Sequence, residues 1–308
     1  MFHALHGALS ASKRPTAPTI WSTVVDSSFD TTTINGVAYG AGKYVAVGNS
    51  GKIATSVNGT EWSLVAVSSF STTAVYDVTY SNGMWVAVGG SGKLATSLDG
   101  VTWTQRTSSF GTAPILCIVY ANNLWVAVGG NGKLATSTNA TSWTQRTSSF
   151  GTTYIYRVSY GSGRWTAAGD LGKLASSTNG TSWTQRVSAI TSTRRIRGVV
   201  TLPTSGLAIA AGDAGAMSTS TNSTVWTAST DASFASTTIS ALVIGSTGSV
   251  LAVGFLGKIG FATPTSMSTI SDFKQLTSNV TATLTAATYG GNKYIAVGAN
   301  GTIVTSNG

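Results

Sequence analysis

The sequence is poor in the residues on which most catalytic and metal-binding sites depend. Its 308 residues include one cysteine, Cys117, one glutamate, Glu61, and two histidines, His3 and His6. A single cysteine excludes an intrachain disulfide and a cysteine-rich metal site. Because Cys117 lies in an apolar run, we interpret it as a small core residue. We expect neither a cofactor nor a metal.

Charged residues and long apolar runs are also scarce. Only 9% of the residues are charged, whereas glycine numbers 36, so hydroxyl groups must supply much of the polar surface. No segment approaches the roughly 20 apolar residues of a membrane span, and residues 1–18 lack the apolar core of a secretory signal. Lysine and arginine number 18 against nine acidic residues, and this excess favours anionic partners.

The chain is dominated by an internal repeat. Its copies align on the second glycine of a Gly-x-Gly-like turn and follow one another at intervals of 40 to 44 residues. The aligned glycines are Gly51, Gly92, Gly132, Gly172, Gly215, Gly257 and Gly301. Seven units of this length, with strand signals and no helical periodicity, predict an all-β fold: a seven-bladed β-propeller of four-stranded antiparallel blades.

Each unit contains strand and turn signals for one blade. In the second unit, an Asn-Gly pair at 82–83 and an Asp-Gly pair at 99–100 are typical of tight hairpins, and glycines 89, 90 and 92 suit a sharp reversal. The strand nearest the N-terminus of the unit is expected to be innermost. The predicted strands are residues 75–80, 85–88, 93–97 and 103–106.

The last repeat ends before its outer strand, and the N-terminal region can supply it. Trp21 and its neighbours resemble the outer strands that begin at Trp62, Trp103, Trp143, Trp183 and Trp226. We therefore expect residues 19–308 to form one propeller whose ring is closed by the N-terminal strand. Residues 1–18 are expected to be a docking or disordered arm. Its candidate anchoring residues are His3, His6, Lys13 and Arg14.

The turns that precede the repeated tryptophans resemble a known motif. Ser56–Trp62, Ser97–Trp103, Ser137–Trp143 and Ser177–Trp183 are similar to the Asp-box, or bacterial neuraminidase repeat. They are one residue shorter than that motif, and only Asp99 retains its aspartate. The resemblance extends over nearly all of residues 20–308 and implies a propeller of the kind found in sialidases, in Ycf48-like photosystem assembly factors and in phage tail or virion proteins.

The sequence offers little catalytic chemistry. Two-carboxylate glycoside hydrolysis needs a close pair of acidic groups, and the only plausible pair is Asp170 and Asp213, which occupy equivalent turns in adjacent units. We interpret both as turn-forming residues. The repeat region contains no histidine, nucleophile elbow or phosphate-binding loop. The protein is therefore expected not to be an enzyme.

Basic residues recur at equivalent positions and define a candidate anion-binding face. They are Lys52, Lys93, Lys133, Lys173, Lys258, Arg157, Arg194, Arg195 and Arg197. The alternative is that the lysines only solubilise their turns and protect the blade edges. Phe70, Phe110 and Phe150, in repeated Ser-Ser-Phe loops, are candidate ligand contacts, with packing against the next blade as the alternative.

These observations favour a non-enzymatic structural or attachment protein. We expect a component of a phage virion or tail that presents a rigid interaction platform, contacts other virion proteins through residues 1–18 and can assemble into oligomers. A lectin-like propeller at a cell surface or outside the cell, binding a host glycan or another anionic polymer, is the main alternative. A sialidase-related enzyme is a weaker one.

Overall fold

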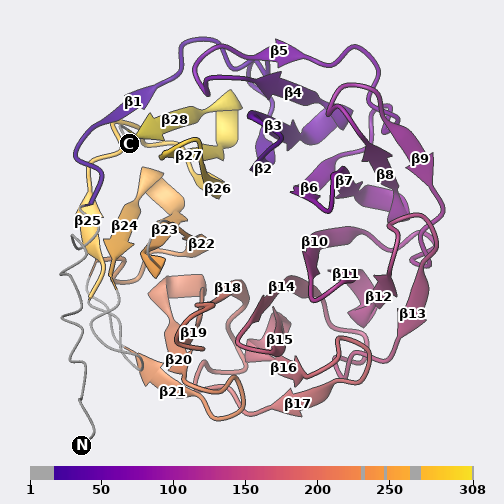
Figure 1. Ribbon diagram of the computed structural model, residues 1–308. Coiled ribbons are helices and arrows are strands. Elements are labelled where there is room, and N and C mark those ends of the chain that lie inside the picture. The colour runs from indigo at the N-terminus through magenta and orange to yellow at the C-terminus, as the bar shows by residue number, and fades with distance from the viewer. Residues whose placement is uncertain (1–16, 230–232, 246–247, 264–271, 307–308) are drawn as a thin grey trace, which may run out of the picture.

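The protein is a ring of seven blades around a central axis (Figure 1), as the repeat predicts. The computed structural model describes residues 17–229, 233–245, 248–263 and 272–306. Each blade is a four-stranded antiparallel sheet, and in six of the seven blades the strands run outward from the axis in chain order. Residues 1–16, which carry His3, His6, Lys13 and Arg14 of the predicted arm, lie outside the described residues.

Four concentric sets of strands form the ring. The innermost set is β2 (Ile34–Gly40), β6 (Val75–Ser81), β10 (Ile115–Ala121), β14 (Ile155–Gly161), β18 (Ile196–Thr201), β22 (Ile239–Ile244) and β26 (Leu284–Gly290). The second set is β3 (Lys43–Gly48), β7 (Met84–Gly89), β11 (Leu124–Gly129), β15 (Arg164–Gly169), β19 (Ala208–Gly212), β23 (Val250–Gly254) and β27 (Lys293–Gly298).

The two outer sets are shorter. The third strands are β4 (Ile53–Ser56), β8 (Leu94–Ser97), β12 (Leu134–Ser137), β16 (Leu174–Ser177), β20 (Met217–Ser220), β24 (Ile259–Ala262) and β28 (Ile303–Ser306). The outermost are β5 (Ser63–Leu64), β9 (Thr104–Arg106), β13 (Thr144–Arg146), β17 (Thr184–Arg186), β21 (Thr227–Ser229), β25 (Lys274–Leu276) and β1 (Trp21–Thr23). We number the blades 1 to 7 from β2–β5 to β26–β28, and β1 completes blade 7.

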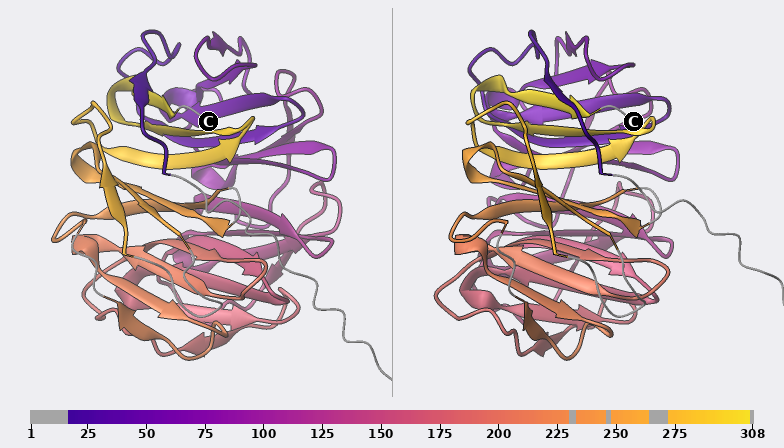
Figure 2. Two further views of the ribbon diagram at one scale, coloured as in Figure 1. Left: turned by 60° about the vertical axis from the view of Figure 1, so that its left-hand side comes forward. Right: turned by 90° about the vertical axis from the view of Figure 1, so that its left-hand side faces the viewer.

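The N-terminal strand closes the ring, which confirms the sequence prediction. β1 pairs with β28 in the register Trp21 to Ser306 and Thr23 to Val304, so the two ends of the chain share one sheet (Figures 1 and 2). Trp21 is buried, and its carbonyl accepts a hydrogen bond from Asn279 Nδ2 at 2.8 Å. The closure pairs the outer edge of β28, which would otherwise lack a partner strand.

The core lies between adjacent blades. The second strand of each blade is buried on both faces, because its side chains pack alternately on the preceding and following sheets. Between blades 1 and 2, for example, Val45 and Ile53 of blade 1 share an apolar cluster with Val75 and Trp85 of blade 2. Trp85 also stacks at a tilt on Tyr80 across the hairpin, with ring centroids 4.9 Å apart. The repeated aromatic residues therefore build the fold.

A one-turn 3₁₀ segment links the second and third strands of each blade, at η1 (Asn49–Gly51), η2 (Gly90–Gly92), η3 (Gly130–Gly132), η4 (Asp170–Gly172), η5 (Asp213–Gly215), η7 (Phe255–Gly257) and η8 (Ala299–Gly301). The aligned glycine ends each of them. In blade 3 its φ is 63°, and a Cβ at Gly132 would lie 1.9 Å from the carbonyl oxygen of Gly151. Only glycine fits both the conformation and the space.

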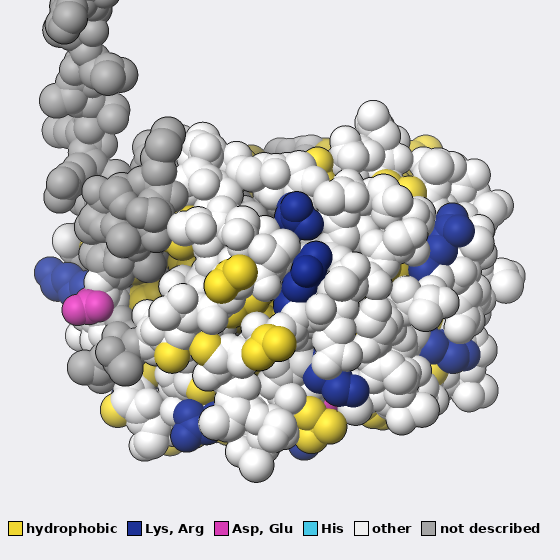
Figure 3. All heavy atoms as spheres, turned by 90° about the horizontal axis from the view of Figure 1, so that it is seen from below, with side chains coloured by type: hydrophobic (Ala, Val, Ile, Leu, Met, Phe, Trp, Pro, Cys, Tyr) yellow, Lys and Arg dark blue, Asp and Glu magenta, His cyan; other side chains and the backbone are white. Residues whose placement is uncertain are grey.

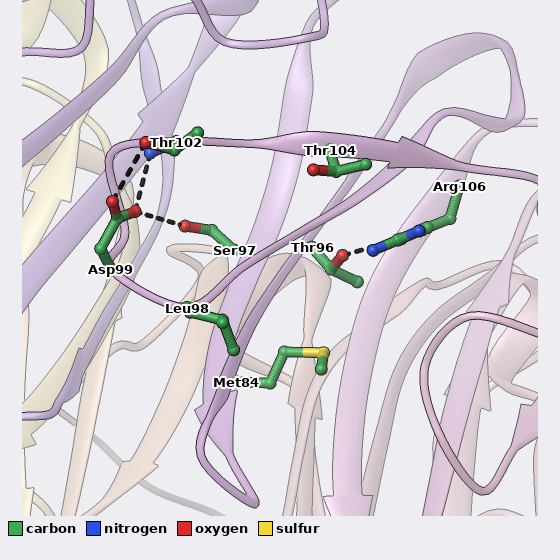
Figure 4. A pocket seen from close by; sticks show the side chains of 8 residues that line it. All are labelled: Met84, Thr96, Ser97, Leu98, Asp99, Thr102, Thr104 and Arg106. Carbon is green, nitrogen blue, oxygen red and sulfur yellow. Dashed lines mark hydrogen bonds between the residues drawn. The ribbon is translucent and has the colours of Figure 1, made fainter.

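The turn before each outer strand is held by a side-chain network. In blade 2, Ser97 Oγ donates to Asp99 Oδ1 and accepts the Gly100 N–H, while Asp99 Oδ1 also accepts the Thr102 N–H at 2.7 Å (Figure 4). Trp103 Nε1 then donates to the Gly100 carbonyl at 3.1 Å. Asn58, Asn139, Asn179 and Asn222 accept the corresponding backbone N–H groups in other blades. In these four blades an asparagine amide oxygen thus does what the Asp99 carboxylate does in blade 2.

Candidate functional site

Every innermost strand carries a β-bulge at its second residue. The pairing register with the second strand shifts by one between the first and third residues, so one extra side chain is turned out of the sheet. The bulge residues are Asn35, Tyr76, Leu116, Tyr156, Arg197, Ser240 and Thr285. The same structural device therefore directs one side chain from each blade toward the axis.

The seven bulge residues surround a cavity of about 200 Å³ on the axis. Arg157, Phe255 and Thr283 complete its lining, and we call it the axial cavity. Because the bulges lie at the start of the innermost strands, the cavity lies toward the face that bears the 3₁₀ turns. We call this the turn face. The predicted Arg157 and Arg197 thus come together.

The lining of the axial cavity is chemically uneven. Blades 6, 7 and 1 contribute the small polar side chains of Ser240, Thr285 and Asn35. Blades 2 to 5 contribute larger side chains and both positive charges, from Tyr76, Leu116, Tyr156, Arg157 and Arg197. No carboxylate is among the lining residues, so the cavity offers hydrogen-bond donors, aromatic rings and cations.

Arg197 is held in a defined orientation. Its Nε donates to Asp213 Oδ1 at 2.6 Å, and its guanidinium carbon lies 6.0 Å from the centre of the Phe255 ring. The other Asp213 oxygen accepts the backbone N–H of Arg195 at 3.1 Å. With Nε engaged, the terminal nitrogens of Arg197 remain as donors for a ligand.

Asp170 fixes the neighbouring aromatic residue in the same way. Tyr156 donates its hydroxyl to Asp170 Oδ1 at 3.0 Å, and Arg195 Nε lies 3.4 Å from the same oxygen. Burial, and then the Asp170 carboxylate, raise the pKa of Tyr156 to about 12, so its phenol stays protonated. Asp170 and Asp213, the only plausible glycosidase pair in the sequence, therefore both act on adjacent cationic and phenolic side chains.

Arg157 lies over a polar seam between blades 2, 3 and 4. Its Nη1 donates to the carbonyls of Leu116 and Tyr156 at 3.1 and 3.0 Å. Asp77 in blade 2 accepts the backbone N–H of Ile118 in blade 3. Burial raises the pKa of Asp77, and the charge of Arg157 opposes that shift.

Cys117 sits within this seam and is buried, as predicted for a core residue. Burial, with a further contribution from the Asp77 carboxylate, raises the pKa of its thiol to about 12. A thiol that remains protonated at neutral pH is a poor nucleophile. Cys117 therefore has the chemistry of a packing residue.

The recurring lysines fasten loops on the turn face. Each lies immediately before a third strand, and its Nζ donates to the carbonyl of a phenylalanine in the loop that enters the blade. The pairs are Lys52 with Phe29, Lys93 with Phe70, Lys133 with Phe110, Lys173 with Phe150 and Lys258 with Phe234, at 2.8 to 3.4 Å. None of these lysines lines the axial cavity.

The structure corrects the expectation that Phe70, Phe110 and Phe150 contact a ligand. All three side chains are 1% exposed, because each loop folds inward and packs its ring in an inter-blade cluster. On the turn face, these residues present their backbone carbonyls, which accept the hydrogen bonds of the lysines. Packing, the alternative interpretation of these residues, is what the structure shows.

Arg194 and Arg195 lie just before β18 on the turn face but outside the axial cavity lining. Sequence reasoning missed Tyr76, Tyr156, Asn35 and Phe255. A signal for the bulge residues was present in the sequence. When the innermost strands are aligned, the first residue is always apolar, whereas the second residue varies widely among the blades. In the described part of the chain, no group of acidic, histidine or cysteine residues could hold a metal, and no helix could span a membrane.

Comparisons with known proteins identify the fold. No protein-family model and no curated protein matches the chain. Among solved structures, YCF48 from Cyanidioschyzon merolae is 17% identical, with a TM-score of 0.72 over 94% of this chain and 99% of its own. YCF48 bound to a D1 peptide is 14% identical, with a TM-score of 0.75 over 95% of this chain and 96% of its own.

An enzyme shares the same architecture. The virginiamycin B lyase of Staphylococcus aureus, solved as a catalytically inactive histidine variant with quinupristin, is 13% identical. Its TM-score is 0.75 over 93% of this chain and 98% of its own. At these identities the likeness shows the fold alone, and that fold carries both a lyase and a peptide-bound protein. The expected likeness to phage propellers stays a prediction.

Proposed function

We propose that the protein is a non-enzymatic binding platform that holds an acidic segment of a partner protein at the axial cavity. The observation that carries this proposal is the convergence of Arg157, Arg197 and two tyrosines on one cavity whose lining contains no carboxylate. Fixed guanidinium groups bind carboxylates through paired hydrogen bonds. An acidic side chain or a terminal carboxylate is the group that this lining complements.

The size of the axial cavity favours part of a polymer over a whole small molecule. Its volume of about 200 Å³ is below the roughly 300–1,000 Å³ typical of small-molecule pockets. A peptide could place one side chain inside while its backbone crosses the turn face. The solved complex of a protein with this fold and a peptide is consistent with such a binding mode.

The solved lyase is inactivated by loss of a histidine, and residues 19–308 of this chain contain none. The histidines of this chain are His3 and His6. Asp170 and Asp213, which contact the lining residues Tyr156 and Arg197, are paired with arginines. These features support binding without chemistry. The placement in a phage particle and the anchoring role of residues 1–18 remain predictions.

A peptide-display selection on the full chain tests the proposal. We expect it to enrich acidic peptides, and we expect Arg197→Gln to weaken them about tenfold by fluorescence anisotropy, since a charged hydrogen bond is lost. Arg164→Gln at the start of β15 is the matched control, because it removes an arginine from the face opposite the turn face without touching the cavity. Peptides without acidic groups, or equal affinity for Arg197→Gln and the parent, would contradict the proposal.

A further inference from the structure

The outer strands of blades 2, 3 and 4 each end in an arginine with a fixed guanidinium. Arg106, Arg146 and Arg186 pair with the first residue of the neighbouring third strand, at the turn-face end of the blade. Each donates its Nε to a buried hydroxyl on that strand. The acceptors are Thr96 Oγ1 at 2.9 Å, Thr136 Oγ1 at 3.0 Å and Ser176 Oγ at 2.7 Å.

None of these three arginines is neutralised by a carboxylate. The ion pairs within the described residues are Lys52–Asp30, Arg195–Asp170 and Arg197–Asp213. Since Nε is already engaged and the guanidinium is planar, the orientation of the terminal nitrogens is set. In the described ranges these nitrogens have no hydrogen-bond partner, so each arginine presents a fork suited to an oxyanion. Figure 4 shows this arrangement for Arg106 and Thr96.

In blades 3 and 4 the arginine lines a groove together with a lysine, whose ammonium group is bound to the loop that enters the blade. Lys133 and Arg146 line one groove of about 490 Å³, together with Gln145, Ser148 and Ser149. Lys173 and Arg186 line the corresponding groove of blade 4, of about 570 Å³, together with Gln185 and Ser188. We call these two the rim grooves. Blade 2 carries Lys93 and Arg106 at the equivalent positions, but the groove of about 460 Å³ that Arg106 lines there contains Asp99, Leu98 and Met84 and not Lys93 (Figure 4).

The other blades lack the pair, so the doubly charged positions form an arc of three consecutive blades. The equivalent residues are Lys52 and Val65 in blade 1, Ala216 and Ser229 in blade 5, Lys258 and Leu276 in blade 6, and Thr302 and Val24 in blade 7. The blade 1 groove, of about 440 Å³, contains Lys52 but no arginine, and the apolar residues Leu64 to Val67, at the end of β5 and just after it, line it instead. In addition, Lys52 is paired with Asp30 at 2.7 Å.

Apart from Asp99, which lines the groove of Arg106, acidic groups are scarce near this arc, and the outer strands of blades 2, 3 and 4 carry none. Figure 3 views the molecule from the side on which β17 and β21 lie in Figure 1, and basic side chains are spread over it while acidic ones are almost absent. A polyanion that reached one groove would meet little repulsion on its way to the next.

We propose that the arc formed by blades 2, 3 and 4 binds an acidic polysaccharide, with one sulfate or carboxylate group in each blade. The arginines occupy equivalent positions in three consecutive blades, and such regular spacing suits a polymer that presents an oxyanion at regular intervals. Glutamine amides and serine hydroxyls beside the charges suit the hydroxyl groups of sugars. Aromatic side chains, on which single-stranded nucleic acids stack their bases, are missing from the linings of both rim grooves. These features favour a glycan over a nucleic acid.

Because the three arginines lie on one ring, we expect the affinity for a glycan to depend on the length of the glycan chain. A single site gives weak binding, whereas a chain that spans the arc gains from the effective concentration of its later groups. With heparin oligosaccharides as probes and the full chain immobilised, we expect affinity to rise at least about tenfold from tetrasaccharide to the longest fragment. Hyaluronan, which carries carboxylates only, shows whether sulfate is required, and binding of either glycan supports the proposal.

The decisive variant is the triple substitution Arg106→Gln, Arg146→Gln and Arg186→Gln. It should weaken heparin binding at least about tenfold near physiological salt, because each fork loses its charge and its paired donors. A matched control removes three charges from the opposite face, at the first residues of β3, β15 and β27, as Lys43→Gln, Arg164→Gln and Lys293→Gln. The control should weaken binding less than about threefold, since only the long-range field changes.

Two results would overturn the proposal. One is equal weakening by the rim and control triple variants when both have the thermal midpoint of the parent, since binding would then follow net charge alone. The other is equally tight binding of a single-stranded DNA of matched charge. Arg197→Gln should weaken heparin binding less than about threefold, as the control does, while it weakens the acidic peptides about tenfold, so failure at the rim and failure at the axial cavity can be told apart.

Discussion

The repeated turns keep the same residue type in every blade, whereas the bulge residues of the innermost strands differ from blade to blade. At the turns, all seven blades use the same chemistry, with a glycine of positive φ before the third strand in every blade. At the bulges, the backbone geometry is the same in all seven blades, but the side chains run from serine to arginine. The turns serve a single requirement of the fold, whereas the bulge positions can vary because they line a cavity. The turns thus serve stability, and the binding that we propose uses a different part of the same repeat.

The largest expected effect comes from breaking the ring. A chain that begins at Phe29 lacks β1, its pairing with β28 and the buried Trp21, and loss of a buried tryptophan alone costs about 3–5 kcal/mol. We expect a large fall in thermal midpoint by differential scanning calorimetry. A chain that begins at Ala17 is the control and should match the parent. An unchanged midpoint for the shorter chain would contradict closure by β1.

The next effect separates two glycines with similar backbone angles. Gly132 and Gly163 have φ values of 63° and 75°, but a Cβ at Gly132 would collide with a carbonyl, whereas nothing lies within 4 Å of Gly163. Gly163→Ala should cost about 1 kcal/mol from backbone strain, and Gly132→Ala about 2–4 kcal/mol because the loop must also move. Urea unfolding measures both. Equal costs would show that the loop relaxes freely.

A smaller, pH-dependent effect is expected at the turn before β9, where Asp99 holds the position that asparagine holds in blades 1, 3, 4 and 5. Backbone N–H groups of Thr102 and Val101 lower the pKa of Asp99 below its usual range. The stabilisation by its carboxylate is therefore complete above the unfolded pKa of about 3.9 and is lost as the pH falls toward the folded value. Asp99→Asn should leave the midpoint nearly unchanged at pH 7, because asparagine fills this position in other blades.

The same variant should then become relatively more stable than the parent as the pH is lowered below 4, since its amide does not titrate. Thermal unfolding between pH 2.5 and 7 follows this difference, with Asn139→Asp as the reciprocal change in blade 3. A constant difference between parent and variant across that range would mean that the turn does not favour the carboxylate.

The smallest effect on stability is expected at the bulges. Tyr76→Asn should change the free energy of unfolding by about 0.5 kcal/mol or less, because this half-buried side chain lines a cavity and blade 1 already carries Asn35 at the equivalent position. Chemical denaturation gives this value, and peptide binding by the same variant gives its functional cost. A destabilisation as large as that of Gly132→Ala would remove the distinction between turn and bulge positions.

Much of the fold was predictable because the same strand and turn signals recur in the sequence of each blade. The four strands of blade 2 were placed to within a residue or two, and Trp21 identified the closing strand, since glycine turns and alternating apolar residues act over short distances. Only some residues of the predicted basic face come together in the structure. Arg157 and Arg197 meet at the axial cavity, whereas the lysines bind loop carbonyls.

By itself, the sequence determined the number of blades, the order of their strands and the turns that join them, because these depend on local conformation repeated every 40 to 44 residues. Only the tertiary structure decided which side chains meet. A bulge that rotates one residue out of each sheet collects Tyr76, Tyr156 and Arg197 from blades far apart in the chain, and the inward fold of the loops buries Phe110. Such positions depend on the register of pairing and on ring closure, which no single repeat contains.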